Sequence, residues 1–201
     1  MFLIALLLFL CYRTVYQQST KTYRPRNRKN DKSFKKLSRP DREKLIRQLT
    51  AEGTFNAAIE RLPFLRSIGV DAIWLMPVYP IGKEGRKGSL GSYYSIRDYK
   101  AVNPEFGTME DFDSFVAKAH SLGMKVILDW VANHTARDAK WLQTKPADWY
   151  EREDDGTAKV PWDWTDTAKL NYSNHDVWRG QIDAMRFWVE QHAIDGFRCD
   201  M

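Results

Sequence analysis

Three stretches of the chain carry polar side chains of the kinds that do chemistry in enzymes. "DWVANH" holds a carboxylate, an amide and an imidazole, "GFRCD" a guanidinium and a carboxylate, and "GSYYSIRDY" phenols and a carboxylate. Arg198 and Asp200 are two residues apart, so on one strand their side chains point to the same face. A nearby guanidinium favours the ionised form of an acid. The candidate site residues are Tyr94, Asp98, Asp129, Asn133, His134, Arg198 and Asp200.

Taken alone, each candidate also has a structural explanation. Asp129 or Asp200 could cap the helix that follows, His134 could bind a loop carbonyl, and Arg198 could form a structural ion pair. A shared site requires that the fold bring these residues together although they are far apart in the sequence.

After Thr50 the chain alternates between helical and strand-like patterns. "TFNAAIERLPFLRSIG" predicts a helix that is interrupted at Pro63 and ends at Gly69. "DAIWLMPV", "KVILDWV" and "GFRCD" read as strands, and the unbroken apolar run of the second is typical of a strand that helices cover. The expected apolar face of the helix is Phe55, Ile59, Leu62, Leu65 and Ile68.

Two further helices are predicted between these strands. In "TMEDFDSFVAKAHSLG", Thr108 and Asp111 resemble a capping box with Asp in place of Glu, and Gly123 ends the helix. Its apolar stripe is Phe112, Phe115, Ala119 and Leu122. "DVWRGQIDAMRFWVEQHAIDG" predicts the last helix, with an inward face of Ile182, Met185 and Val189.

The alternation of strand, long connection and helix predicts a parallel α/β sheet. A doubly wound fold would be expected to carry a glycine-rich loop after its first strand, and "IWLMPV" is followed by none that opens a helix. The connections that follow the strands carry aromatic, acidic and histidine residues instead. This pattern favours the N-terminal half of a (β/α)8 TIM barrel, about strands 1–4, whose chemistry lies at the carboxyl ends of the strands.

The first 44 residues differ from the rest of the chain. Residues 1–12, "MFLIALLLFLCY", are too short to span a bilayer and have the length of a signal-peptide core, although no positive charge precedes them. Residues 13–44 are polar and basic, which is typical of a disordered linker or of sequence foreign to the domain. We expect residues 45–201 to be a partial catalytic domain, and we expect the protein to be exported, periplasmic or attached to a membrane by its N-terminus. A cytoplasmic location is the alternative.

The net charge of +5 comes from one segment, "TKTYRPRNRKNDKSFKKLSR". From Pro40 onward acidic residues outnumber basic ones, so nucleic acid is not an expected partner. The two cysteines, Cys11 and Cys199, give neither a disulfide framework nor the spacing of a metal site.

Four segments together resemble the α-amylase family, retaining glycoside hydrolases (family 13) that act on α-glucosidic bonds. They are "GVDAIWLMPVYPIG", "SYYSIRDYKAVNPEFGT", "LDWVANHT" and "IDGFRCD", in the family's order and covering the chain from about Gln48. The resemblance implies a substrate of the starch or maltodextrin type, an α-glucan or maltooligosaccharide. It requires no cofactor, although in some relatives an asparagine matching Asn133 binds calcium.

The resemblance also implies roles for the candidate residues. Asp200 matches the nucleophile that forms a covalent glycosyl-enzyme, and Arg198 would keep it ionised. His134 matches a histidine that hydrogen-bonds the sugar at the cleaved bond, and Tyr94 matches the aromatic that stacks under it. Asp129, Asn133 and Asp98 are supporting residues.

Two features depart from the family pattern. The histidine expected just before the stacking tyrosine is absent, with Ser92 and Tyr93 in its place, and the segment "DREKLIRQLT" is a poor first strand. The family's general acid is a glutamate after the fifth strand. We therefore expect this chain to be an inactive N-terminal fragment that ends at the nucleophile motif.

Other functions stay open at this point. A non-catalytic, amylase-like barrel subunit or α-glucan-binding protein would lack a working nucleophile, whereas a transglycosidase would share it. A barrel metallohydrolase would use Asp129, His134 and Asp200 as ligands and would need a second histidine near a strand end. The other histidines, His120, His175 and His192, all lie on or beside predicted helices.

Overall fold

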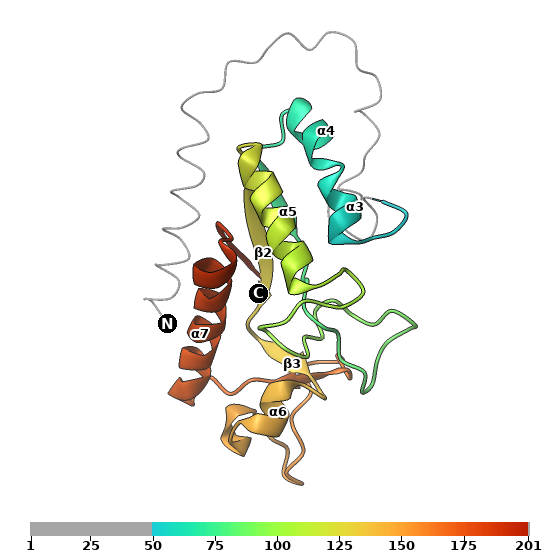
Figure 1. Ribbon diagram of the computed structural model, residues 1–201. Helices are drawn as coiled ribbons and strands as arrows, with labels where there is room; N and C mark the ends of the chain where they lie inside the picture. The colour runs from blue at the N-terminus through green and yellow to red at the C-terminus, as the bar shows by residue number, and fades with distance from the viewer. Residues whose placement is uncertain (1–49, 201) are drawn as a thin grey trace. The chain divides into compact units, whose positions relative to one another are not determined.

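The computed structural model describes residues 50–200. Our predictions for residues 1–12, for residues 13–44 and for a first strand before Thr50 lie outside the described residues. The described elements, drawn in Figure 1, are α3 (Phe55–Ile59), α4 (Leu62–Ser67), β1 (Ala72–Leu75), α5 (Met109–Ser121), β2 (Lys125–Val131), β3 (His134–Ala136), α6 (Lys140–Thr144), a 3-10 helix (Ala147–Trp149), β4 (Thr167–Lys169), α7 (His175–His192) and β5 (Gly196–Asp200).

The three predicted strands form one parallel sheet in the order β1-β2-β5. Helix α5 connects β1 to β2 and helix α7 precedes β5, which is the alternation expected for consecutive units of a (β/α)8 barrel. The structure also contains a second sheet, which the sequence did not predict. It pairs the short strands β3 and β4 antiparallel, within the long connection between β2 and α7.

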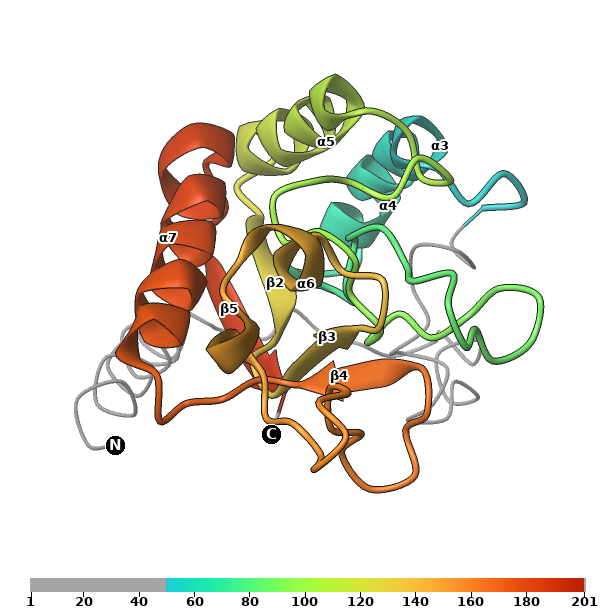
Figure 2. The ribbon, with the colours of Figure 1, turned by 90° about the horizontal axis from the view of Figure 1, so that it is seen from below.

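The helices follow one another along one side of the parallel strands, as Figure 2 shows for α7, α5, α3 and α4. The main core lies between them and the sheet. Alternate residues of the strands enter this core, and they are Ile73, Leu75, Val126, Leu128 and Trp130. The other face of β1 is open, since Trp74 is 39% exposed.

Helix α5 begins as predicted. The Thr108 hydroxyl accepts from the Asp111 N–H at 3.2 Å, and the Asp111 carboxylate accepts from the Thr108 N–H at 2.8 Å. The predicted break in the first helix is also confirmed. Pro63 lies in the first turn of α4, and Gly69 ends it with a positive φ of 91°.

The predicted inward face of α7 was wrong for Ile182 and Val189, which are each 46% exposed. The buried residues are Val177, Gln181, Ala184 and Trp188, while Met185 is partly buried. The helix is rotated by about one residue because the Trp188 ring enters the core, where its indole N–H donates to the Tyr99 carbonyl at 2.6 Å. Burial of the large Trp188 ring with its N–H hydrogen-bonded stabilises the fold more than burial of the two aliphatic side chains would.

Within residues 50–200, helices that are both long enough and apolar enough to cross a membrane are absent.

Candidate active site

Strand register brings the candidate residues of β2 and β5 together. Asp129 lies opposite Arg198 in the parallel ladder, and Val131 lies opposite Asp200. Nη1 of Arg198 donates to both carboxylate oxygens of Asp129, at 3.1 and 3.0 Å, and to Oδ1 of Asp200 at 2.7 Å. One guanidinium therefore joins two carboxylates at the carboxyl ends of neighbouring strands, as a barrel site requires.

The two carboxylates differ in their surroundings. The side chain of Asp129 is completely buried, whereas that of Asp200 is 26% exposed. Burial raises the pKa of Asp129 to about 6, although Arg198 acts in the opposite direction. Asp129 is therefore out of reach of a substrate and positions Arg198, while Asp200 presents a carboxylate to solvent.

His134 and Tyr94 lie close enough to this cluster to be influenced by its charges. Burial raises the pKa of Tyr94 to about 12, with contributions from the charges of Asp129 and Asp200. Burial lowers the pKa of His134, and the Tyr94 backbone carbonyl and the charge of Asp200 partly oppose this effect. The His134 ring is thus neutral near pH 7 and able to both donate and accept hydrogen bonds.

Asn133 orients the histidine, since its side-chain Nδ2 lies 3.2 Å from His134 Nδ1. The Asn133 carbonyl accepts from the Leu170 N–H at 3.2 Å, which ties this loop to the segment after β4. Asp98 behaves differently from the other candidates. Its carboxylate pairs with Lys140 at 3.0 Å and accepts from the Lys100 N–H, and the structure does not join it to the Arg198 cluster.

Sequence reasoning missed Trp74 as part of the site. Its ring lies under the Arg198 guanidinium, with 5.0 Å between Cζ and the ring centroid, and its side chain acts to lower the pKa of Asp129 against the effect of burial. The strand period could have revealed it, because Trp74 pairs with Ile127 and so lies on the face of β1 that matches Asp129.

A second missed residue is Asp166, in the loop before β4. It is 3% exposed, its Oδ2 has no hydrogen-bond partner, and Lys87 lies 3.7 Å from its Oδ1. Its charge reaches His134, where it raises the pKa against the effect of burial. No motif signalled this residue.

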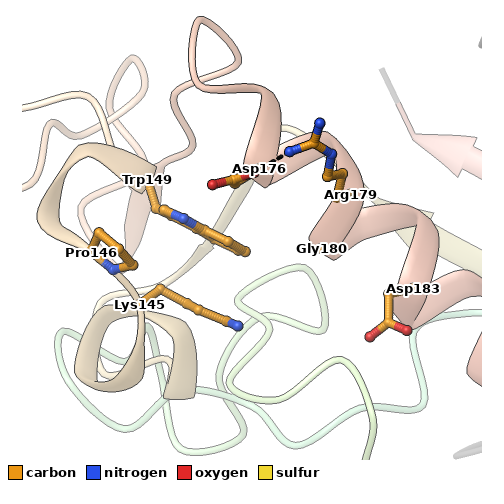
Figure 3. A pocket seen from close by; sticks show the side chains of 7 residues that line it. All are labelled: Lys145, Pro146, Trp149, Asp176, Arg179, Gly180 and Asp183. Atoms are coloured by element: carbon orange, nitrogen blue, oxygen red, sulfur yellow. Dashed lines mark hydrogen bonds and ion pairs between the residues drawn. The ribbon is translucent and has the colours of Figure 1, made fainter.

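A pocket lies elsewhere, between α7 and the segment that joins α6 to the 3-10 helix (Figure 3). Lys145 lies over the Trp149 ring at 4.9 Å, and Arg179 pairs with Asp176 at 2.7 Å. The lining residues are Lys145, Pro146, Trp149, Asp176, Arg179, Gly180 and Asp183, none of which is a candidate site residue. The candidate residues at the strand ends therefore do not line this pocket.

The metallohydrolase alternative finds no support in the geometry. In the part of the chain that the structure describes, no three His, Cys, Asp or Glu side chains gather closely enough to hold a metal ion. Calcium takes six to eight oxygen ligands, so Asn133 alone does not make a site. Calcium binding through Asn133 stays a prediction.

Known proteins share both the sequence pattern and the fold. The sequence model of the protein family described as the α-amylase catalytic domain matches residues 16–201. An α-amylase structure from Lactobacillus plantarum is 40% identical with a TM-score of 0.74, over 77% of this chain and 36% of that one. Trehalose-6-phosphate hydrolase of Bacillus subtilis is 32% identical, over 74% of this chain and 31% of that protein. An α-1,4-glucan:maltose-1-phosphate maltosyltransferase of Rhodospirillum rubrum is 36% identical, over 74% and 24%.

The chain thus spans about a third or less of the length of these relatives. The family match covers most of the chain, and the parallel β/α order of the described residues agrees with it. The chain belongs to the α-amylase family of glycoside hydrolases, and its described residues form part of that family's (β/α)8 barrel.

Proposed function

We propose that the whole protein is a retaining glycoside hydrolase that cleaves α-1,4-glucosidic bonds of starch-like glucans or maltooligosaccharides. The observation that carries the proposal is the Arg198 guanidinium between Asp129 and Asp200, with His134 and Tyr94 beside it. The Arg198 guanidinium donates to Asp200 Oδ1 at 2.7 Å and so orients the carboxylate that would attack the sugar.

The first step follows from this arrangement. An Asp200 oxygen attacks the anomeric carbon, and the bond from that carbon to the leaving sugar oxygen breaks with its electron pair going to the oxygen. That oxygen takes a proton from a general acid, and water later cleaves the covalent glycosyl-enzyme. His134, neutral and nearly buried, would hydrogen-bond the hydroxyls of the attacked sugar, and Tyr94 would stack beneath its ring.

The general acid is assigned to no residue of the described part. Asp129 is a poor candidate although its pKa is about 6, because its carboxylate is completely buried and occupied by Arg198. In the family that the chain resembles, the acid is a glutamate after the fifth strand, which supports an acid outside the described residues. We therefore also propose that these 201 residues on their own do not turn over substrate, since an unprotonated sugar alkoxide is a poor leaving group.

The stereochemistry of the product tests the proposal. Proton NMR of maltoheptaose cleavage by the whole protein should show the α-anomer first, because two displacements retain configuration. Asp200→Asn should lower kcat by several orders of magnitude and change binding little, since it removes the attacking oxygen. An initial β-anomer, or an Asp200→Asn variant with normal turnover, would refute the mechanism.

A transglycosidase is the second candidate, and the maltosyltransferase among the relatives favours considering it. The covalent step is the same, and only the acceptor of the glycosyl group differs. Incubation with maltotriose separates the two functions, because transfer gives products longer than the substrate whereas hydrolysis gives shorter ones.

We propose export or N-terminal membrane attachment as the location, supported by the apolar run of residues 1–12. A reporter fused after residue 50 should leave the cytosol. A reporter that stays soluble and uncleaved in the cytosol would exclude this location.

A further inference from the structure

The loop before β4 presents a tryptophan whose exposure and backbone conformation the fold does not explain. Trp162 is 65% exposed, more than any other large apolar side chain of the described residues. Its φ is +51°, a left-handed conformation that costs a bulky residue roughly 1–2 kcal/mol and that glycine or asparagine adopts more readily. Because the ring is exposed, its burial does not offset this conformational cost.

The loop fixes the backbone that carries this ring. The Trp164 N–H donates to the Pro161 carbonyl at 3.2 Å, which closes a turn with Trp162 at its tip. The Trp164 carbonyl accepts from the Thr167 N–H and hydroxyl, at 2.9 and 2.8 Å. The Asp163 carbonyl accepts from Lys87 at 3.3 Å. A turn fixed on both sides presents its ring with little ordering left to do on binding.

The ring is also connected to the candidate active site. Trp162 contacts Trp164 with 4.6 Å between ring centroids, and Trp164 contacts His134 edge to face at 5.1 Å. Three rings thus lead from the buried histidine to the exposed indole. The exposed ring lies within reach of an oligosaccharide chain that starts at His134.

We propose that Trp162, supported by Trp164, is a binding subsite for a further sugar ring of a carbohydrate chain held at His134. An indole face is flat and apolar, and it matches the C–H face of a pyranose ring while the sugar hydroxyls stay in water. The planes of the two indoles are inclined by 53°. An inclined pair follows a curved α-1,4-glucan better than the flat ribbon of a β-1,4-glucan.

This inference rests on the proposed function for the sugar at His134, but its test does not require turnover. Binding of maltoheptaose and of maltose is measured by titration calorimetry in the whole protein carrying Asp200→Asn, so that glucan is not consumed. Trp162→Ala should weaken maltoheptaose binding roughly tenfold and maltose binding much less, since only the longer chain reaches the loop.

Three further variants separate stacking from structure. Trp162→Tyr should keep most of the affinity, because it keeps an aromatic face. Trp162→Asn should lose it while the thermal midpoint stays equal or rises, because asparagine tolerates the left-handed turn. Phe64→Ala is the matched control, since Phe64 is 61% exposed and lies on α4. It should bind like the parent.

Equal maltoheptaose affinity of the parent and Trp162→Ala would overturn the subsite. An equal loss for maltose and maltoheptaose would overturn it as well, since it would indicate a disturbed site at His134. A parent that binds no α-glucan would overturn both this inference and the proposed function. A chain-length-dependent loss in a protein without hydrolase activity would support the subsite and refute only the hydrolase.

Discussion

Replacing Asp129 by asparagine should stabilise the protein at pH 7 although it breaks an ion pair. Asp129 is completely buried, and its pKa is raised from 3.8 to about 6 in spite of Arg198. The desolvation of the carboxylate therefore outweighs its attraction to the guanidinium. The pKa difference between 3.8 and about 6 corresponds to roughly 3 kcal/mol. At neutral pH, ionised Asp129 lowers the free energy of unfolding by this amount relative to protonated Asp129.

Asparagine has nearly the same shape and carries no charge, so it removes this cost. The amide hydrogens of asparagine would face the Arg198 donor, and this unfavourable contact offsets part of the stabilisation. The expected increase in the free energy of unfolding is therefore about 1–3 kcal/mol. Activity should nevertheless fall about tenfold to a hundredfold, because Arg198 loses the carboxylate that positions it beside Asp200.

Urea unfolding of the whole protein between pH 3.5 and 7.5 measures the effect. The folded pKa of Asp129 lies above the unfolded value, so the folded state holds the proton more tightly. Wild-type stability should therefore fall as pH rises from about 4 to about 6, and the variant should lack this loss. The advantage of the variant should be small below pH 4, grow across this window and stay constant above it.

Asp98→Asn is the matched control, because Asp98 pairs with Lys140 at 3.0 Å outside the Arg198 cluster. Its effect should stay within about 0.5 kcal/mol at all pH values. If Asp129→Asn instead destabilises the protein at pH 7, attraction to Arg198 outweighs desolvation and the reasoning is wrong.

Four further substitutions test the fold by urea unfolding. Trp188→Ala should cost about 3–5 kcal/mol because the ring is fully buried, whereas Val189→Ala, on the exposed side of α7, should stay within about 0.5 kcal/mol; the reverse order would restore the face expected from sequence. Thr108→Ala removes one half of the capping box and should cost about 1 kcal/mol, and an unchanged stability would mean that α5 needs no cap. Burial raises the pKa of Asp195, but hydrogen bonds from Lys125 and from the backbone of β2 outweigh it and lower the pKa. Asp195→Asn should therefore cost about 1 kcal/mol at pH 7, and this cost should disappear as pH falls below about 4; a cost that persists in acid would argue against the ion pair.

Local patterns in the sequence were sufficient for the three parallel strands and the helices packed on them, but not for β3, β4, α6 or the 3-10 helix. A capping box, a proline in a first turn and a glycine with positive φ act through neighbouring backbone groups, so the start of α5 and the break before α4 could be predicted from a few residues. The unbroken apolar run of β2 indicated a strand that helices cover, because hydrophobicity can also be read from a few consecutive residues. The spacing of Arg198 and Asp200 predicted that they share a face, and they share a hydrogen bond.

Tertiary structure decided what local patterns leave open. The register between β2 and β5 placed Asp129 against Arg198, and burial made the Asp129 and Asp200 carboxylates unequal. Which face of α7 packs depended on the fit of one large ring into the core, which aliphatic periodicity does not encode. Trp74, Asp166 and Trp162 reach the site or its edge through strand pairing and loop closure. Contacts between residues distant in the sequence have no local pattern, because they depend on how the whole chain closes.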